Sequence, residues 1–195
     1  MSHAMRLPAC LIVTGILTAG ATFAPAVHSQ EKSETKLPKT FVIGDAYKMT
    51  APEGWVAKQP RTKIVEHEFA VPAVKGDELD GRVTVMGAGG SVEANIERWH
   101  KQFTQPDGSN TKDKAKLEKK KIAGQDVTIV DISGTYMDSP GPQAPGVERK
   151  DYRMLAAIVQ TKSGNAFIKF YGPQKTVTEN ASAFNKMLES LQSSK

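Results

Sequence analysis

The clearest alternation of apolar and polar residues begins at residue 82 and changes its spacing after a run of glycines. Val83 and Val85 point to one side of an extended chain, the period of a strand with one buried face. Beyond the glycines, Ser91 is suited to begin a helix as its N-cap. Apolar residues then recur three or four positions apart, at Val92, Ile96, Trp99 and Phe103. The pattern predicts a strand, a tight turn and an amphipathic helix on a sheet, with Trp99 buried at the centre of the helix's apolar stripe.

The glycine turn between this strand and helix has the spacing that begins a dinucleotide-binding loop. In such loops the glycines allow a tight turn, close approach of a pyrophosphate and close helix packing. Gly87 and Gly89 fit the first two positions, but Val92 stands where the third glycine or alanine belongs. In place of the acidic residue expected on a second strand about 20 residues later, Asp107 lies in a loop sequence. We therefore expect a structural corner here and no nucleotide site.

Further alternating segments predict most of the remaining chain as strands. They lie at residues 41–43, 47–51, 63–71, 112–117, 125–136, 152–161 and 166–171. Within the third of these, His67 falls on the apolar side, where we expect a partly buried, hydrogen-bonded histidine. Trp55 directly follows a turn sequence and is expected to close one end of the core. The proline-rich segment Met137–Lys150 is expected to be a surface loop, a common place for functional residues.

A second amphipathic helix is predicted near the C-terminus. Thr176 and Glu179 form a capping-box pattern at its start. Its buried stripe contains Val177, Ala181, Phe184, Leu188 and Leu191. Short turns between consecutive strands imply antiparallel pairing, and two helices that each follow a run of strands must cover the sheet. We expect an α+β sandwich in which helices cover an antiparallel sheet of about six or seven strands.

The first 26 residues have the features of a secretory signal peptide. Arg6 precedes an apolar stretch at residues 11–23, and residues 24–26 form an A-x-A cleavage site, with residues 27–29 as an alternative. We expect residues 27–40 to be a flexible leader and residues 41–195 to be one domain, exported to the periplasm or beyond. No transmembrane segment is expected in the mature chain. Cys10, the only cysteine, would leave with the signal peptide, so the mature protein would contain neither a disulfide nor a reactive thiol.

Charge is concentrated in one short segment of an otherwise mildly basic chain. The formal net charge is +5, and it becomes +4 once Arg6 is removed. The segment holds six lysines within ten residues: Lys112, Lys114, Lys116, Lys119, Lys120 and Lys121. They fit either the outer side of an edge strand, where lysines prevent edge-to-edge pairing, or a docking patch for an acidic protein or an anionic surface. Aromatic residues do not interleave with them, so we expect no nucleic-acid partner.

The sequence contains no motif of a known catalytic site. The G-x-S-x-G elbow, the H-E-x-x-H zinc motif and the phosphate-binding P-loop are all missing. No catalytic, cofactor-binding or metal-binding residue is therefore assigned, and no cofactor is expected. A Ser-His-Asp triad remains open, because its members are neighbours in space and not in sequence.

Several segments together resemble the PsbP-like and Mog-like α/β/α sandwich proteins, in particular exported bacterial members of that group. They are APEGW at 51–55, the helix at 91–103, the hairpin at 120–136, and IKFYGP at 168–173 followed by a helix. The resemblance covers residues 47–191. It implies non-enzymatic roles, which are an accessory subunit on photosystem II for PsbP and binding of a small GTPase for the Mog-like proteins. No binding residue of either family can be matched to a position in this chain.

The leading hypothesis from the sequence is an exported, monomeric binding or accessory module that acts through its surface. One alternative is a carrier that holds a small molecule or lipid in a cleft between the sheet and a helix. A second alternative is a hydrolase whose catalytic residues come together only in the folded chain.

Overall fold

The computed structural model describes residues 40–194, except 45, 88 and 140–144. The expected signal peptide and nearly all of the expected leader lie outside these residues. The described residues belong to one compact unit, Lys36–Lys195. None of the helices within the described residues is long and apolar enough to cross a membrane.

Strands dominate the structure. They are β1 (Thr40–Ile43), β2 (Tyr47–Thr50), β3 (Val56–Lys58), β4 (His67–Val71), β5 (Gly81–Gly87), β6 (Phe103–Thr104), β7 (Lys116–Ile122), β8 (Gln125–Asp138), β9 (Val147–Thr161), β10 (Gly164–Pro173) and β11 (Gln192–Ser193). The helices are α1 (Val92–His100), α2 (Thr111–Lys114), α3 (Gln174–Glu179) and α4 (Ala181–Glu189).

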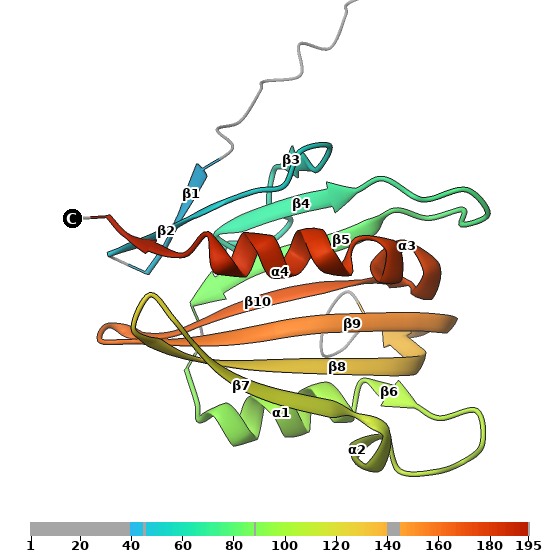
Figure 1. Cartoon of the computed structure of the whole chain (residues 1–195). Coiled ribbons are helices and arrows are strands. Elements are labelled where there is room, and N and C mark those ends of the chain that lie inside the picture. Colours follow the sequence, from blue (N-terminus) through green and yellow to red (C-terminus); the bar gives the residue numbers. More distant parts are fainter. Residues whose placement is uncertain (1–39, 45, 88, 140–144, 195) are drawn as a thin grey trace, which may run out of the picture. The chain divides into compact units, whose positions relative to one another are not determined.

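Eight of the strands form one antiparallel sheet, in the order β3-β4-β5-β10-β9-β8-β6, with β7 also paired to β8 (Figure 1). A smaller sheet has the order β1-β2-β11. The expected α+β class with a large antiparallel sheet is confirmed, with one strand more than the upper estimate of seven. The large sheet includes β3 and β6, which were not predicted because three and two residues are too few to show a period. The strands predicted at 41–43 and 47–51 lie in the smaller sheet.

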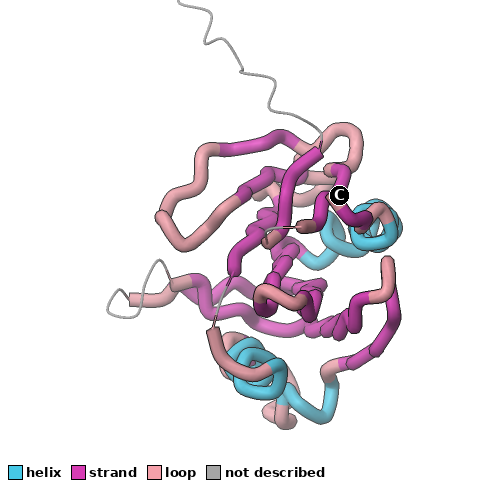
Figure 2. Tube along the Cα trace, turned by 90° about the vertical axis from the view of Figure 1, so that its left-hand side faces the viewer, coloured by secondary structure: helices cyan, strands magenta, loops and turns pink. Residues whose placement is uncertain are grey.

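Helices cover both faces of the large sheet, and the two groups of helices lie on either side of the strands in Figure 2. The alternation along β9 shows the division most simply. Leu155, Ala157 and Val159 belong to a core that includes Phe184 of α4. The residues between them, Met154, Ala156 and Ile158, belong to a second core with α1. Because both faces of β9 are buried, its sequence is a continuous apolar run.

The predicted strand, turn and helix at residues 82–103 are confirmed, with one correction at the end of the helix. The Ser91 hydroxyl accepts a hydrogen bond from the Ala94 amide at 3.1 Å, as an N-cap does. Trp99 is 7% exposed and meets the ring of Phe167 edge-on. However, α1 ends at His100, and Phe103 lies in β6. Phe103 still joins the same core, so its apolar spacing reflected burial and not a further helical turn.

The C-terminal helix differs from the prediction in its start and its continuity. It begins at Gln174, and it is divided at Asn180 into α3 and α4. Thr176 is therefore not the N-cap. Its amide and hydroxyl instead donate to the Asp77 carboxylate at 2.8 and 2.6 Å. A side chain distant in sequence thus satisfies the donors that a local capping box would have satisfied.

Several predicted strand boundaries also change. The strand expected at 63–71 begins at His67, because a turn bond from the Val65 amide to the Thr62 carbonyl holds the preceding residues. Residues 111–114 form α2, whose start is capped by Asn110, so the strand expected at 112–117 begins only at Lys116. The expected loop at 137–150 is shorter, because β8 continues to Asp138 and β9 begins at Val147.

The two single residues interpreted from sequence behave as expected. His67 is half-buried, and its Nε2 lies 2.8 Å from the Val42 carbonyl oxygen. Trp55 packs against Phe170, and its indole nitrogen donates to Asn180 at 3.4 Å.

Candidate functional site

The face of the sheet that carries α1 becomes polar along β10 and β5. There the side chains form a cleft of about 610 Å³, here called the arginine–tyrosine cleft. The residues that define it are Arg61, Glu68, Arg82, Arg149, Tyr152 and Tyr171. Strands β4, β5, β8, β9 and β10 supply most of its lining, so a rigid scaffold positions the polar groups.

Arg82 is fixed at three points at the floor of this cleft. Its Nε and Nη2 each donate to one oxygen of the Glu68 carboxylate at 2.8 Å, a bidentate pair. Its Nη1 donates to the Tyr171 hydroxyl at 2.6 Å. Burial alone would raise the pKa of Glu68, but the bonds and charge of Arg82, aided by Arg61, outweigh burial and lower it. The bond to Glu68 raises the pKa of Arg82 above its ordinary value. Both groups are therefore charged throughout the physiological pH range.

Lys169 lies beside this pair and between aromatic rings. Its ammonium donates to Gln102 Oε1 at 2.7 Å and to the Tyr136 hydroxyl at 3.2 Å. It also lies 4.5 Å from the ring centroid of Tyr171 and 4.9 Å from that of Tyr136, within cation–π range. Burial, and secondly the like charge of Arg82, lower the pKa of Lys169 to about 7.

Three tyrosines complete the network. Tyr136 is stacked in parallel on Tyr152, with ring centroids 6.0 Å apart, and is tilted against Tyr171 at 5.2 Å. Burial raises the pKa of all three phenols, so they remain neutral hydrogen-bonding groups. Each ring fixes its neighbours, which leaves little rotamer freedom in the floor of the cleft.

The charged side chains at the rim of the cleft are more exposed to solvent than those at its floor. The Arg61 side chain is 77% exposed and its Nε lies 3.8 Å from Glu68. Arg149 donates to Asp138 at 3.4 Å, and both side chains are partly exposed. The lining also includes Lys58 and Asp80, so four cations face three carboxylates and the cleft has one excess positive charge. A partner's carboxylate would find exposed guanidinium groups at the rim.

Neither His67 nor His100 is hydrogen-bonded to a serine or an aspartate within the described residues, so these two histidines form no Ser-His-Asp triad there. The Nε2 atom of His67 is hydrogen-bonded to the Val42 carbonyl oxygen. His100 is buried, neither of its ring nitrogens has a hydrogen-bond partner there, and Nδ1 is 3.9 Å from Glu97. No three histidine, cysteine or acidic side chains among the described residues are grouped as a metal would require.

The six lysines predicted from sequence are not gathered on one surface. Lys112 and Lys114 lie on α2, and the other four lie on the edge strand β7. The β7–β8 register divides these four, because Lys119 and Lys121 share a side with Thr128 and Asp126, whereas Lys116 and Lys120 lie on the opposite side.

Neighbouring acids also neutralise most of these lysines. Ion pairs join Lys112 to Glu97, Lys114 to Asp107, Lys120 to Glu118 and Lys121 to Asp126. Lys116 and Lys119 form no ion pair within the described residues. Because β7 pairs only with β8 among the described strands, its four lysines lie on an edge strand, the position in which lysines oppose edge-to-edge pairing.

The arginine–tyrosine cleft was not found from the sequence. The sequence feature that could have indicated it is a single polar residue on the buried side of each of three strands. These residues are Glu68 on β4, Arg82 on β5 and Lys169 on β10. Single polar positions of this kind become a site only when the register aligns them. Glu68 lies opposite Thr84, next to Arg82 on the same side, and Arg82 lies opposite Tyr171.

Comparison with known proteins gives likeness in fold alone. No family model matches the chain, and no curated protein matches its sequence. Solved structures that match include PsbP (CyanoP) of Synechocystis sp. PCC 6803, with a TM-score of 0.46 and 12% identity over 82% of this chain and 95% of that one. PA94 of Pseudomonas aeruginosa matches with a TM-score of 0.44 and 12% identity, over 77% and 93% of the two chains. LpqN, involved in cell envelope biogenesis of Mycobacterium tuberculosis, has a TM-score of 0.44 and 12% identity, over 78% and 86%.

Proposed function

We propose that this protein is an exported, non-enzymatic accessory module that binds a protein partner through the arginine–tyrosine cleft. The observation that carries the proposal is Arg82, fixed by two bonds to Glu68 and one to Tyr171 at the floor of the cleft. Arginine and tyrosine are enriched among the residues that dominate binding energy at protein interfaces. Because the network already holds these side chains, little conformational entropy is lost when a partner binds.

The charge of the rim indicates the chemistry of the partner. Arg61 and Arg149 extend toward solvent, and the cleft carries one excess positive charge. Leu79, an exposed apolar residue, lies at the same cleft. A partner segment with a carboxylate beside an apolar side chain complements this surface. Opposite charge also accelerates encounter, more strongly at low salt.

The proposal is tested by quantitative capture from the native cell envelope. The cleft variant is Arg61→Glu with Arg149→Glu, and the comparison variant replaces Lys119, Lys120 and Lys121 by Gln. A partner that the parent and the lysine variant retain, and that the cleft variant loses at low and physiological salt, supports the cleft. The reverse pattern would assign docking to the lysines of β7, as the sequence alone suggested. Partners retained equally by all three proteins would refute both surfaces.

Export is tested separately, because it rests on the sequence of residues 1–26 alone. Mass spectrometry of the protein from its native cells is expected to find an N-terminus near Val27 or Gln30. A mature protein that retains Met1 would contradict export and the accessory role in the envelope together.

A further inference from the structure

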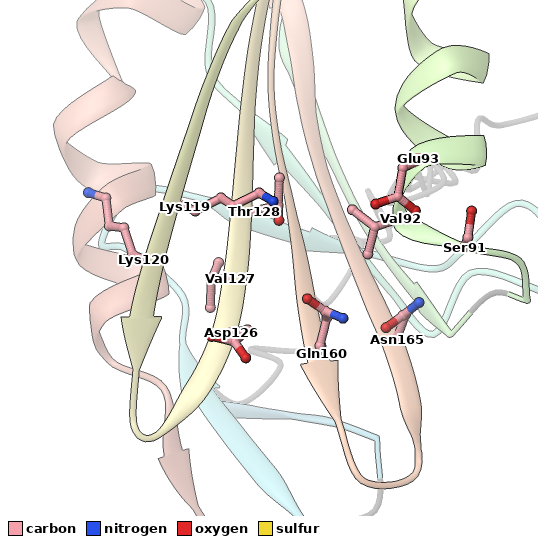
Figure 3. A pocket seen from close by; sticks show the side chains of 10 residues that line it. All are labelled: Ser91, Val92, Glu93, Lys119, Lys120, Asp126, Val127, Thr128, Gln160 and Asn165. Carbon is pink, nitrogen blue, oxygen red and sulfur yellow. The ribbon is translucent and has the colours of Figure 1, made fainter.

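A second hollow lies between the first turn of α1 and strand β7, at the opposite end of the helix from Gln102 (Figure 3). We call it the helix-entry pocket, and its volume is about 460 Å³. The polar residues that matter here are Ser91, Glu93, Lys119, Thr128, Gln160 and Asn165. They come from α1, β7, β8, β9 and β10, so five elements converge on a space of small-molecule size.

Thr128 gives the first sign that this hollow is a binding site. Its side chain lies on β8 and the residue is only 3% exposed, yet it lines the pocket. Among the described residues the Thr128 hydroxyl has no hydrogen-bond partner. Among the described residues only the His100 ring nitrogens are both buried and without a partner, so the Thr128 hydroxyl oxygen remains accessible from the pocket. An unpaired hydroxyl that faces a pocket is therefore available to a ligand.

Two opposite charges that form no ion pair within the described residues give the second sign. Figure 3 shows Lys119 directed into the pocket from β7, and Glu93 directed into it from the side of α1. The neighbours of Lys119 behave differently, because Lys120 pairs with Glu118 at 3.2 Å and Lys121 with Asp126 at 2.7 Å. Lys119 and Glu93 thus stand on opposite sides of the hollow, with a gap between them instead of a salt bridge.

The floor between these charges supplies neutral hydrogen-bonding groups. Gln160 lies at the end of β9, and Asn165 lies across from it on β10. The Asn165 amide nitrogen donates to the Gly90 carbonyl at 3.3 Å, which fixes this amide beside the entry of α1. The donors and acceptors of the floor suit a polar ligand and not an aliphatic one.

We propose that the helix-entry pocket binds a small zwitterion. The anionic group of the ligand pairs with Lys119 and accepts a hydrogen bond from Thr128, and its ammonium group pairs with Glu93. The side-chain amides of Gln160 and Asn165 contact the part between the two charged groups. Lys120 and Asp126 also line the pocket, but each already has an ion-pair partner on β7. Because the remaining charges, Lys119 and Glu93, balance each other, a ligand with both charges satisfies the site without leaving either one unpaired. This site is separate from the arginine–tyrosine cleft and shares no residue with it.

A series of small amines that also carry an anionic group tests which anionic group the pocket prefers and which separation of the two charges fits it. The full chain, labelled with ¹⁵N, is titrated with glycine, 4-aminobutyrate, 6-aminohexanoate and phosphoethanolamine, and with butyrate and butylamine as probes that carry one charge each. One zwitterion is expected to shift the amide signals of Glu93, Thr128 and Gln160 at a concentration at least tenfold lower than either single-charge probe. Preference between the carboxylates and phosphoethanolamine identifies the anionic group. Equal responses to butyrate, butylamine and the zwitterions, or no response at these residues, would overturn the proposal.

A second lysine on β7 provides a matched control. Lys119→Gln is expected to weaken binding of the preferred probe at least tenfold, whereas Lys116→Gln should leave it unchanged, because Lys116 lies on the same strand but does not line the pocket. Thr128→Val retains the shape of the side chain and removes the hydroxyl, and it should also weaken binding. The double variant Glu93→Lys with Lys119→Glu exchanges the two charges, so it should bind the same probe with its anionic and ammonium groups reversed. An equal loss in the Lys119 and Lys116 variants would show a general charge effect and refute the site.

Discussion

The two faces of the large sheet are built from the same strands but differ in the polarity of the side chains that line them. Along β10, Ile168 and Phe170 are fully buried on the side of α4, whereas Lys169 and Tyr171 point to the side of α1. The first side is closed by apolar packing. The second is closed by apolar packing under α1 and β6, and beyond them it becomes a polar network. Odd and even positions of one strand thus contribute to two environments, one apolar throughout and one that is partly polar.

The two faces differ in the free energy of removing their side chains from water. Apolar burial on the α4 side stabilises the fold roughly in proportion to the area removed from water. The polar groups on the α1 side gain less, because each gives up hydration before it finds a protein partner. What they gain is fixed geometry, as the three bonds of Arg82 show. The substitutions below measure the two contributions separately.

The largest effect is expected from removal of a ring on the apolar side. Phe184→Ala leaves a cavity against Phe170, and such a change typically costs ~3–5 kcal/mol. Trp99→Ala on the other face is expected in the same range and somewhat below Phe184→Ala, because Trp99 is not completely enclosed. Urea denaturation gives both values. A melting temperature for Trp99→Ala within about two degrees of the parent would contradict the packing described here and favour a binding role for the ring.

The next effect concerns the Glu68–Arg82 pair. Glu68→Gln leaves the Arg82 guanidinium without its counter-charge and should cost ~1–3 kcal/mol at pH 7. Because the pKa of Glu68 is lowered on folding, its contribution is complete above the ordinary value of 4.5 and is lost as the pH falls further through the folded value. Denaturation curves between pH 2 and pH 7 should therefore be less pH-dependent in the variant. Glu53→Gln, at an exposed position, is the control. Parallel curves for parent and Glu68→Gln would show that the pair does not contribute.

Lys169 should make stability rise with pH as well, but in a higher pH range than Glu68. Its pKa falls from 10.5 to about 7 on folding, so between these values the unfolded chain binds a proton that the folded protein does not. Stability therefore rises with pH in this range, by up to ~1.4 kcal/mol per pH unit. Lys169→Met should abolish the rise when unfolding is measured from pH 7 to 9.5, below the range in which the tyrosines ionise. An unchanged slope in the variant would mean that another group is responsible.

The smallest effect on stability is expected from the edge strand. Replacement of Lys119, Lys120 and Lys121 by Gln removes exposed pairs whose worth is at most ~1 kcal/mol each. The melting temperature should therefore change little. Self-association at high concentration is the informative measurement, because lysines on an edge oppose strand-to-strand pairing. A variant that melts much lower would show that these lysines contribute to the fold itself.

Sequence patterns predicted the architecture where each residue's environment depends on close neighbours. The helix start at Ser91 and the apolar run of β9 are of this kind. The predictions were wrong where a distant partner intervened, as when Asp77 took the place of a local cap at Thr176. The lysine cluster looked uniform in sequence, but register and acidic neighbours divided it. Both pockets depend on which residues the pairing of strands brings together, and a single sequence does not contain that register.

The smaller sheet has a consequence for the order in which the chain folds. Strand β2 pairs with β1 a few residues away, but its other edge pairs with β11, where Lys48 faces Gln192. The Thr50 amide bonds to the Ser190 hydroxyl and the Ser194 amide to the Ala46 carbonyl, so nearly the whole domain separates the partners along the chain. Contacts between residues so far apart in sequence form slowly, because closing a large loop lowers the chain entropy before the contacts can stabilise the fold. A chain delivered from its N-terminus cannot complete this sheet until residues 190–194 are available, so the smaller sheet forms after the strands of the large sheet.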